Sequence, residues 1–429
     1  MKSYYKILFF LLPMSAYTQE FISVRGQHFY HHGQAYYIMG ANFWYGMNLG
    51  SLEAGGNRDR LVAELDQLKA LGINNLRIIA GSEGPDTAPW RMSPSLQSAP
   101  GVYNEALWDG LDFLLAEMKK RQMTAVVCLN NFWPWSGGFA QYYAWVHDKP
   151  IPYPPPADGG GWFSYMTFSS RFYKSAKAMA LYEEHIKRVI TRTNCYTNIS
   201  YRDDPTIMSW QLANEPRGML RARAYRNWVQ QTAKLIKALD PNHLVTIGSE
   251  GNTPAPTGNA FVKDHAFDVI DYLTIHIWIQ NWQWYDPAKA TSSYPGAWER
   301  AKSYLERHLV IAEALKKPLV LEEFGIARDN DDHDPAASTE WRDRYFAAMF
   351  ELVYQKAKAG TSMAGCNFWA WGGMGRPSAA RAIWKPGDDF IGDPPHEHQG
   401  WYSVYDKDAS TLEVLRAFGR KIGGIGRGG

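Results

Sequence analysis

The sequence has few cysteines, almost no net charge and no long uninterrupted hydrophobic run. Only Cys128, Cys195 and Cys366 occur in 429 residues, and three cysteines cannot form a disulfide framework. Cys128 and Cys366 lie in apolar, strand-like runs, so we expect buried thiols there. The 45 basic and 43 acidic residues leave a formal charge of +2, which gives no strong attraction to nucleic acid or to a membrane surface. A neutral or weakly charged partner is therefore expected.

Signatures of cofactor binding are also missing. The sequence contains no Gly-rich phosphate loop and no dinucleotide fingerprint. The pair His31-His32 precedes Gly33 at an expected turn, and His396-Glu397-His398 lies in a Pro-rich loop without the helical spacing of a zinc protease. We therefore expect no cofactor and no metal ion.

The first residues have the pattern of a secretory signal. A short basic head, Met1 to Lys6, is followed by an apolar run, Ile7 to Met14, that is too short to span a bilayer. Small residues then lead to Thr18. This pattern predicts a signal peptide over residues 1–18 and a secreted or periplasmic mature chain without a membrane span.

Short β-rich runs alternate with amphipathic stretches along the rest of the chain. Eight runs are predicted as strands: 36–41, 74–79, 124–129, 207–212, 244–247, 272–277, 319–322 and 365–368. Helices are predicted over 58–71, 105–121, 174–193, 221–239, 298–315, 339–358 and 410–418. Regular alternation favours parallel pairing through crossover helices, and eight such units close as an α/β barrel of the (β/α)₈ type, the TIM barrel. A doubly wound open sheet is the alternative.

No fixed-period repeat and no long linker divides the chain, so residues 19–429 are predicted to form one catalytic domain and to act as a monomer. Two long irregular segments, 130–170 and 370–408, are rich in Gly, Pro, Trp and Tyr. Loops of this length usually build a site, and in such a barrel the site lies at the carboxyl ends of the strands.

Two carboxylates stand at predicted strand ends, Glu215 after the fourth strand and Glu323 after the seventh. In an eight-stranded barrel these strands face each other across the mouth. Two opposed carboxylates over a neutral cleft fit glycosidic bond cleavage, because one acid protonates the leaving oxygen and one anion meets the cationic sugar carbon. The neighbours of Glu215 fit this reading. Pro216 fixes φ where a helix could begin, and Asn214 offers an amide to a sugar hydroxyl.

Several motifs resemble glycoside hydrolase family five: Ala213-Asn214-Glu215-Pro216, Glu323-Phe324-Gly325, Asn74-Asn75-Leu76-Arg77 and His276. Further stretches are similar to its endo-β-1,4-mannanase branch: 40–45, 130–133, 137–142, His276-Ile277-Trp278, Asn281-Trp282 and 392–400. The resemblance runs from about Phe21 to about Asp408.

This resemblance implies a retaining double displacement with Glu215 as general acid/base and Glu323 as nucleophile. Arg77 would lie beside Glu323 and keep it ionised, and Glu322 should point away because neighbours in a strand face opposite sides. The substrate, a mannan-type polysaccharide, would be bound by residues at the strand ends and on the long loops: Trp44, Arg77, Asn131, Trp133, Asn214, His276, Trp278, Trp282 and Trp369.

One position departs from the family pattern. Many members have a Tyr two residues after the His, and its hydroxyl supports the nucleophile, whereas this chain has Trp278. An indole N–H can only donate, so another group would have to supply that support. Two alternatives to an endo-acting β-mannanase remain open at this point: an endo-β-1,4-glucanase of the same family, and a carbohydrate-binding barrel that has lost turnover.

Overall fold

The computed structural model describes residues 20–53 and 55–425, so the expected signal peptide lies outside the described residues. Within them, eight parallel strands form one sheet in the order β10-β9-β8-β5-β4-β13-β12-β11. These strands are β4 (Ile38–Asn42), β5 (Asn75–Ile79), β8 (Thr124–Cys128), β9 (Ile207–Gln211), β10 (Leu244–Thr246), β11 (Leu273–Ile277), β12 (Leu319–Phe324) and β13 (Met363–Phe368). Each agrees with a predicted strand to within about two residues at either end.

The two end strands of this order, β10 and β11, are joined by individual hydrogen bonds. The Asp271 amide donates to the Val245 carbonyl at 2.8 Å, and the His276 amide donates to the Glu250 carbonyl at 3.0 Å. Between them, the Thr246 hydroxyl donates to the Tyr272 carbonyl at 3.0 Å. These bonds complete the barrel and exclude the doubly wound open sheet.

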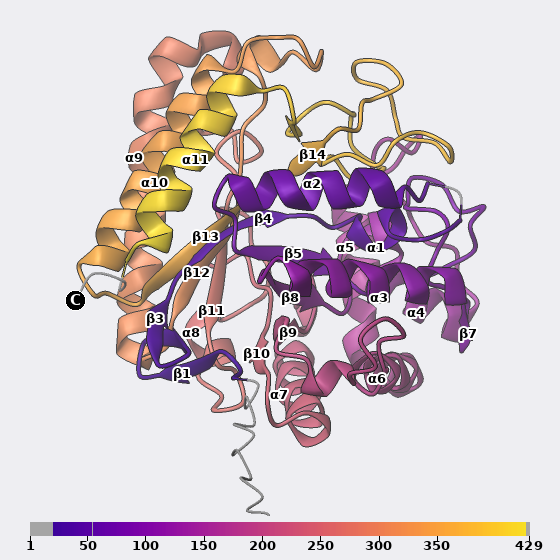
Figure 1. Ribbon diagram of the computed structural model, residues 1–429. Helices are drawn as coiled ribbons and strands as arrows, with labels where there is room; N and C mark the ends of the chain where they lie inside the picture. Colours follow the sequence, from indigo (N-terminus) through magenta and orange to yellow (C-terminus); the bar gives the residue numbers. More distant parts are fainter. Residues whose placement is uncertain (1–19, 54, 426–429) are drawn as a thin grey trace, which may run out of the picture.

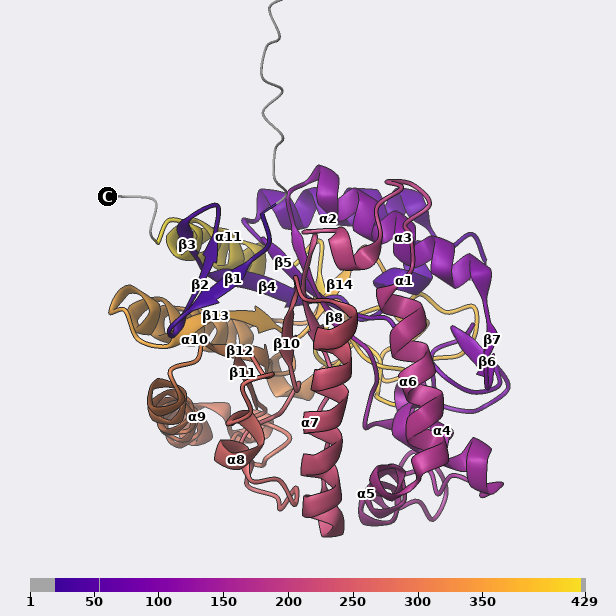
Figure 2. The same ribbon diagram turned by 90° about the horizontal axis from the view of Figure 1, so that it is seen from below.

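Helices surround the strands, as seen when the molecule is viewed from below (Figure 2). The outer helices are α2 (Arg58–Ala70), α3 (Glu105–Lys120), α6 (Ala176–Ile190), α7 (Ala222–Leu239), α8 (Phe261–His265), α9 (Ala290–Leu315), α10 (Glu340–Lys358) and α11 (Ala409–Gly423). In Figure 1, α9, α10 and α11 lie side by side. No helix of residues 20–53 and 55–425 is both long enough and apolar enough to cross a bilayer.

A small antiparallel sheet packs on the amino-terminal end of the barrel. It consists of β1 (Ser23–Arg25), β2 (His28–His31) and β3 (Gln34–Tyr36). Phe29 is buried and meets the ring of Tyr272 edge-on at 5.2 Å, in a cluster with Ile38, Met208 and Val320. This apolar cluster fills the amino-terminal end of the barrel, so a site is expected at the opposite end, where the strands end. Cys128 and Cys366 are buried free thiols, as expected.

Two predicted boundaries were wrong. The helix expected over 298–315 begins at Ala290, and it continues through Pro295, its sixth residue. Proline removes a hydrogen bond from the interior of a helix, so the sequence around it is a poor guide to where α9 begins. The segment 130–170, expected to be irregular, contains α4 (Gly138–His147) and α5 (Trp162–Ser169). The segment 370–408 is irregular apart from β14 (Trp371–Gly373) and β15 (Val404–Tyr405), which pair with each other.

Candidate active site

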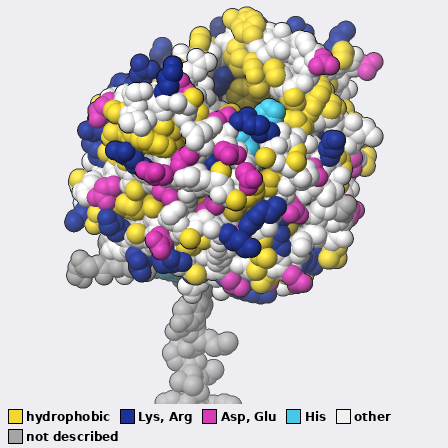
Figure 3. Space-filling model, turned by 90° about the horizontal axis from the view of Figure 1, so that it is seen from above, with side chains coloured by type: hydrophobic (Ala, Val, Ile, Leu, Met, Phe, Trp, Pro, Cys, Tyr) yellow, Lys and Arg dark blue, Asp and Glu magenta, His cyan; other side chains and the backbone are white. Residues whose placement is uncertain are grey.

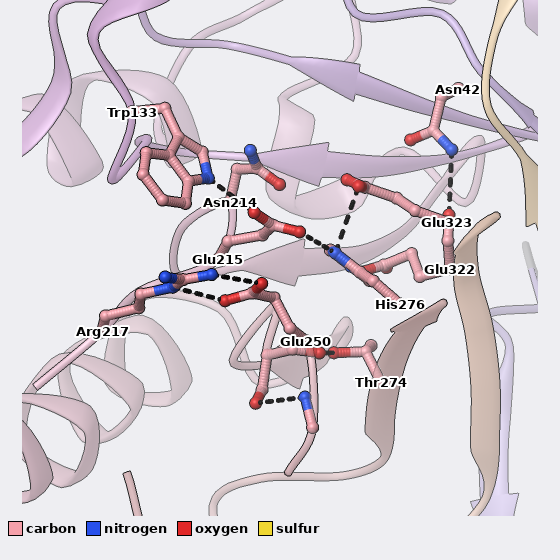
Figure 4. Close-up of polar contacts among 12 residues, drawn as sticks. Asn42, Trp133, Asn214, Glu215, Arg217, Glu250, Thr274, His276, Glu322 and Glu323 are labelled. Atoms are coloured by element: carbon pink, nitrogen blue, oxygen red, sulfur yellow. Dashed lines mark hydrogen bonds and ion pairs between the residues drawn. The ribbon is translucent and has the colours of Figure 1, made fainter. Parts of the chain in front are cut away.

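Glu215 and Glu323 come from distant parts of the chain and meet at one end of the barrel. Glu215 follows β9, and Glu323 lies near the end of β12. The imidazole of His276, on β11, lies between them: its Nδ1 is 2.5 Å from Glu215 Oε1 and 3.1 Å from Glu323 Oε2 (Figure 4). An oxygen of each carboxylate and a nitrogen of the imidazole all lie within 4.8 Å of one another.

His276 is a buried cation in this arrangement. Burial alone would lower its pKa, but Glu323, Glu215 and Glu322 together raise the pKa of His276 well above its ordinary value. The imidazole therefore stays protonated near neutral pH and offsets part of the negative charge around it. These side chains could hold a divalent cation only if His276 lost its proton, and Arg77 already pairs with Glu323.

Arg77, on β5, holds the nucleophile candidate from the other side. Its Nη1 donates to Glu323 Oε1 and, at 3.0 Å, to Asn42 Oδ1. Its Nη2 donates to Asn214 Oδ1 at 2.7 Å, and its Nε donates to Gln211 Oε1 at 2.9 Å. Burial would lower the pKa of Arg77, but Glu322 and Glu323 raise it above its ordinary value. A fixed positive charge therefore lies beside Glu323.

The expectation that Glu322 points away from this network was wrong. Its Oε2 lies 3.4 Å from Arg77 Nε and 3.5 Å from His276 Nε2, and both of its oxygens accept from Gln211 Nε2, at 2.7 and 2.8 Å. The cause is a shift in register between β11 and β12, where Ile275 pairs with Leu321 but His276 pairs with Glu323. This bulge breaks the strict alternation of side chains, so both glutamates reach the same two cations.

The local backbone presents Glu215 to the cleft. Glu215 has a φ of +50°, in the left-handed region that non-glycine residues rarely adopt. The strained position is held by its amide, which donates to the Gly248 carbonyl at 2.9 Å. Pro216 follows, so the chain cannot relax into a helix at once. A strained residue held by its surroundings is typical of functional sites.

Trp133 contacts the other oxygen of Glu215. Its indole Nε1 donates to Glu215 Oε2 at 2.5 Å. Behind it, Asn131 Oδ1 accepts from the Trp133 amide at 3.0 Å and from Asn214 Nδ2 at 3.2 Å. Within the described residues, the buried Asn131 Nδ2 has no hydrogen-bond partner. Asn131 thus supports Glu215 through Trp133, and Asn214 supports Glu323 through Arg77.

The other predicted aromatic residues occupy different environments. Trp278 is half-buried, and its ring lies 5.7 Å from Trp369 and 5.4 Å from Tyr402. Trp44 is 3% exposed, and its indole N–H donates to the Gly392 carbonyl at 3.0 Å, which anchors the loop 392–400. Trp282 packs on Trp284 and on Tyr304 of α9. Of these, Trp44 and Trp369 line a small cavity with Arg77 and Asn214.

Three polar features escaped the sequence reasoning. Gln211 joins Arg77 to Glu322 from inside β9. Glu250 forms a bidentate ion pair with Arg217 at 2.7 Å, next to Glu215 (Figure 4). Glu397 belongs to the loop 392–400, and its Oε2 is buried without a partner among the described residues. Burial raises the pKa of Glu397 well above its ordinary value, and the negative charges of Asp393, Glu323 and Glu215 raise it further.

The loop 392–400 reaches the catalytic pocket through aromatic contacts. The ring of His396 meets Trp162 at 5.9 Å, and Trp162 meets Trp133 edge-on at 5.5 Å. Figure 3 shows a hollow on the face seen from above, with hydrophobic side chains around it and histidine and basic side chains at its rim. The sequence drew attention to this loop through the resemblance of 392–400 to the mannanase branch and through the two histidines beside Glu397, but it assigned no role to Glu397.

Comparison with known proteins gives a consistent result. A model of the family described as "GH family 5 beta-mannosidase-like" matches residues 19–426. The chain is 31% identical to mannan endo-1,4-beta-mannosidase 4 of Solanum lycopersicum, over 86% of this chain and 88% of that protein. It is 32% identical to putative mannan endo-1,4-beta-mannosidase 9 of Oryza sativa subsp. japonica, over 95% and 90%.

Among solved structures, a glycoside hydrolase family 5 mannosidase from Rhizomucor miehei superposes with a TM-score of 0.88 at 39% identity, covering 96% of this chain and 99% of that one. The predicted fold and the predicted resemblance to a family of glycosidases are both confirmed. The chain belongs to the β-mannosidase-like members of glycoside hydrolase family 5.

Proposed function

We propose that this chain is a retaining glycosidase that cleaves β-1,4-mannosidic bonds in mannan, glucomannan or galactomannan. One observation carries the proposal: an oxygen of Glu215 and an oxygen of Glu323 lie within 4.8 Å of each other at the mouth of the barrel. Retaining enzymes place their carboxyl groups about 5–5.5 Å apart, whereas inverting enzymes need about 6.5–9.5 Å to admit a water molecule. The short separation supports direct attack by a carboxylate.

In the first step, a Glu323 oxygen bonds to the anomeric carbon while the bond from that carbon to the leaving oxygen breaks. Glu215 gives its proton to the leaving oxygen. In the second step, Glu215 takes a proton from water, and the water oxygen displaces Glu323 from the sugar. Each step inverts the anomeric carbon once, so the product keeps the β configuration.

The neighbours of the two carboxylates fit these roles. The positive charges of Arg77 and His276 lie next to Glu323 and favour its ionised form. They supply the support for the nucleophile that is expected from the family tyrosine, which Trp278 replaces here. The Trp133 donor fixes the orientation of Glu215. The unpartnered Asn131 Nδ2 is available to a sugar hydroxyl, and Trp278 and Trp369 supply aromatic surface.

The proposed substrate rests on the relatives, two of which are named as mannan endo-1,4-beta-mannosidases and one as a mannosidase. Endo action is the first candidate. Release of single mannosyl units from a chain end is a second candidate, favoured by the loop 392–400, which reaches the pocket, and by the buried, unpartnered Glu397 Oε2. A carboxyl group enclosed in this way suits the hydroxyl groups of a terminal sugar.

The test is product analysis by chromatography on defined manno- and cello-oligosaccharides. Endo action on mannopentaose releases mannobiose and mannotriose early, whereas action from the end releases mannose first. Hydrolysis of cello-oligosaccharides in preference to manno-oligosaccharides would favour the endoglucanase instead. NMR of the first product distinguishes retention from inversion.

A folded chain without turnover on any of these substrates would favour the carbohydrate-binding alternative. The variants Glu323→Ala and Glu215→Ala test the assigned roles, with exposed Glu313→Ala on α9 as a matched control. Loss of turnover in the first two and normal turnover in the control are expected. A Glu323→Ala variant that hydrolyses mannan as fast as the wild type would refute the assigned nucleophile.

We also propose export through residues 1–18 and action as a monomer. The basic head, the short apolar run and the small residues before Gln19 support export. Amino-terminal sequencing of protein recovered from the medium or periplasm should begin near Gln19. Light scattering should give the mass of one chain.

A further inference from the structure

The sequence contains a single acceptor motif for N-linked glycosylation, Asn198-Ile199-Ser200. Such a motif consists of an asparagine, any residue except proline, and then a serine or threonine, and in an exported protein it marks a surface loop. A motif of this length also occurs by chance. The surroundings of Asn198 therefore decide whether a glycan fits there.

Asn198 is exposed, and its side chain is free. It lies in the loop between α6 and η3 (Tyr201–Asp203). Within residues 20–53 and 55–425, its side-chain amide makes no hydrogen bond. Its backbone is fixed, because the Asn198 amide donates to the Asn194 carbonyl at 2.8 Å, and its φ of +55° is one that asparagine tolerates well. An ordered turn thus exposes an amide that has no role in packing.

The rest of this loop is attached to the flank of the barrel. Asn194 Nδ2 donates to the Asp112 carbonyl of α3 at 2.9 Å, and the Tyr201 hydroxyl donates to Asp112 Oδ1 at 2.5 Å. Arg192 pairs with the same carboxylate at 2.7 Å. The polar and ring contacts described for residues 191–201 do not include the catalytic glutamates or the side chains that support them. A glycan on this flank would leave the catalytic cleft open.

Two side chains just before Asn198 are unusually exposed. Cys195 is an exposed free thiol, whereas Cys128 and Cys366 are buried. Tyr196 is 45% exposed. An exposed free thiol in an exported protein is open to oxidation and to pairing between chains. A bulky, hydrated group on Asn198 would stand over this part of the loop.

We propose that Asn198 receives an N-linked glycan during export and that this glycan shields Cys195. The inference rests on the proposed export of the chain. In the transfer, Asn198 Nδ2 bonds to C1 of the first sugar of an oligosaccharide that is carried on a lipid pyrophosphate. The bond from C1 to the pyrophosphate oxygen breaks, the pyrophosphate leaves with the electron pair, and Nδ2 loses one proton. Ser200 supplies the hydroxyl that completes the acceptor motif.

The first experiment tests the attachment. The full chain is produced in a yeast that glycosylates exported proteins, and it is recovered from the medium. Digestion with peptide N-glycosidase should lower its mass to that of the unmodified mature chain, and peptide mass spectrometry should find a deamidated residue at position 198. The variants Asn198→Gln and Ser200→Ala should each lack the glycan. Ser200→Thr is the matched control, since it keeps the hydroxyl and should keep the glycan.

The second experiment tests the shielding. A maleimide should label Cys195 faster after the glycan is removed, and labelling reports on this thiol because the other two are buried. The kcat/KM on mannopentaose should be the same before and after digestion, because the loop lies away from the catalytic network.

The possible failures are distinguishable. A secreted chain that begins near Gln19 and has an unmodified Asn198 would overturn the glycosylation site while export and the hydrolase stand. A mass shift that persists in both Asn198→Gln and Ser200→Ala would also overturn the site. A chain that stays in the cell with residues 1–18 attached would overturn export and glycosylation together. Equal labelling of Cys195 before and after digestion would overturn the shielding.

Discussion

Replacing His276 with glutamine should change how the stability of the protein depends on pH. His276 is fully buried, and Glu323, Glu215 and Glu322 lie close to its ring nitrogens. Because its folded-state pKa is raised well above the ordinary value, the folded protein keeps a proton that the unfolded chain has already lost. The His276 contribution is therefore complete below about pH 6.5 and is lost as pH rises toward the folded-state pKa.

The size of the effect follows from one retained proton. Above about pH 6.5, the free energy of unfolding of the wild type should fall relative to the His276→Gln variant by about 1.4 kcal/mol per pH unit. At pH 6 the variant should be less stable by about 3–5 kcal/mol, because buried carboxylates lose a cationic partner. Urea unfolding of both proteins from pH 5 to 9 measures the difference.

His185→Gln is a matched control. His185 is also buried and its Nε2 lies 2.8 Å from the Ala80 carbonyl, but burial lowers the pKa of His185 to about 4. It is neutral when folded at neutral pH, so its effect should be constant above about pH 7 and change only on the acidic side. Parallel curves for wild type and His276→Gln from pH 6 to 9 would refute the reasoning.

Three further predictions concern the reaction. Trp133→Phe removes the donor to Glu215 and should lower kcat/KM about 10–100-fold, since a hydrogen bond to a charged group contributes about 1.5–3 kcal/mol. An unchanged kcat/KM on mannopentaose would contradict this role of Trp133. Glu397→Ala should lower kcat/KM on mannobiose more than on mannopentaose if the loop 392–400 recognises a chain end, and equal losses would argue for endo action. Azide should restore turnover of an aryl β-mannoside to Glu323→Ala and give a product of α configuration, whereas a β-mannosyl azide would contradict the assignment of the nucleophile.

The alternation of apolar runs with amphipathic helices predicted eight parallel strands, because strands buried on both faces are apolar along their length. The choice between a barrel and a doubly wound open sheet needed the hydrogen bonds that join β10 to β11. Every predicted barrel strand was found close to its expected bounds. The helices inside 130–170 were missed because Gly, Pro and aromatic residues normally mark loops. Here α4 and α5 are short helices stabilised by packing against their surroundings rather than by propensity.

The site could be predicted where a residue stands at the end of a strand. Arg77 and His276 were expected there and do contact the two glutamates. Glu322 was misassigned because a bulge in register leaves no mark in the sequence. Glu250 and Glu397 could not be found in this way, since both lie on loops whose paths depend on tertiary contacts.

The most direct test of the account is to trap the intermediate. A 2-deoxy-2-fluoro-β-mannosyl fluoride should react once with the enzyme and remain attached, because fluorine at C2 slows both steps whereas the good leaving group, fluoride, speeds only the first. Peptide mass spectrometry should find the sugar on Glu323. Attachment to Glu322 or to Glu215, or rapid turnover without a label, would contradict the assignment of Glu323 as the group that meets the anomeric carbon.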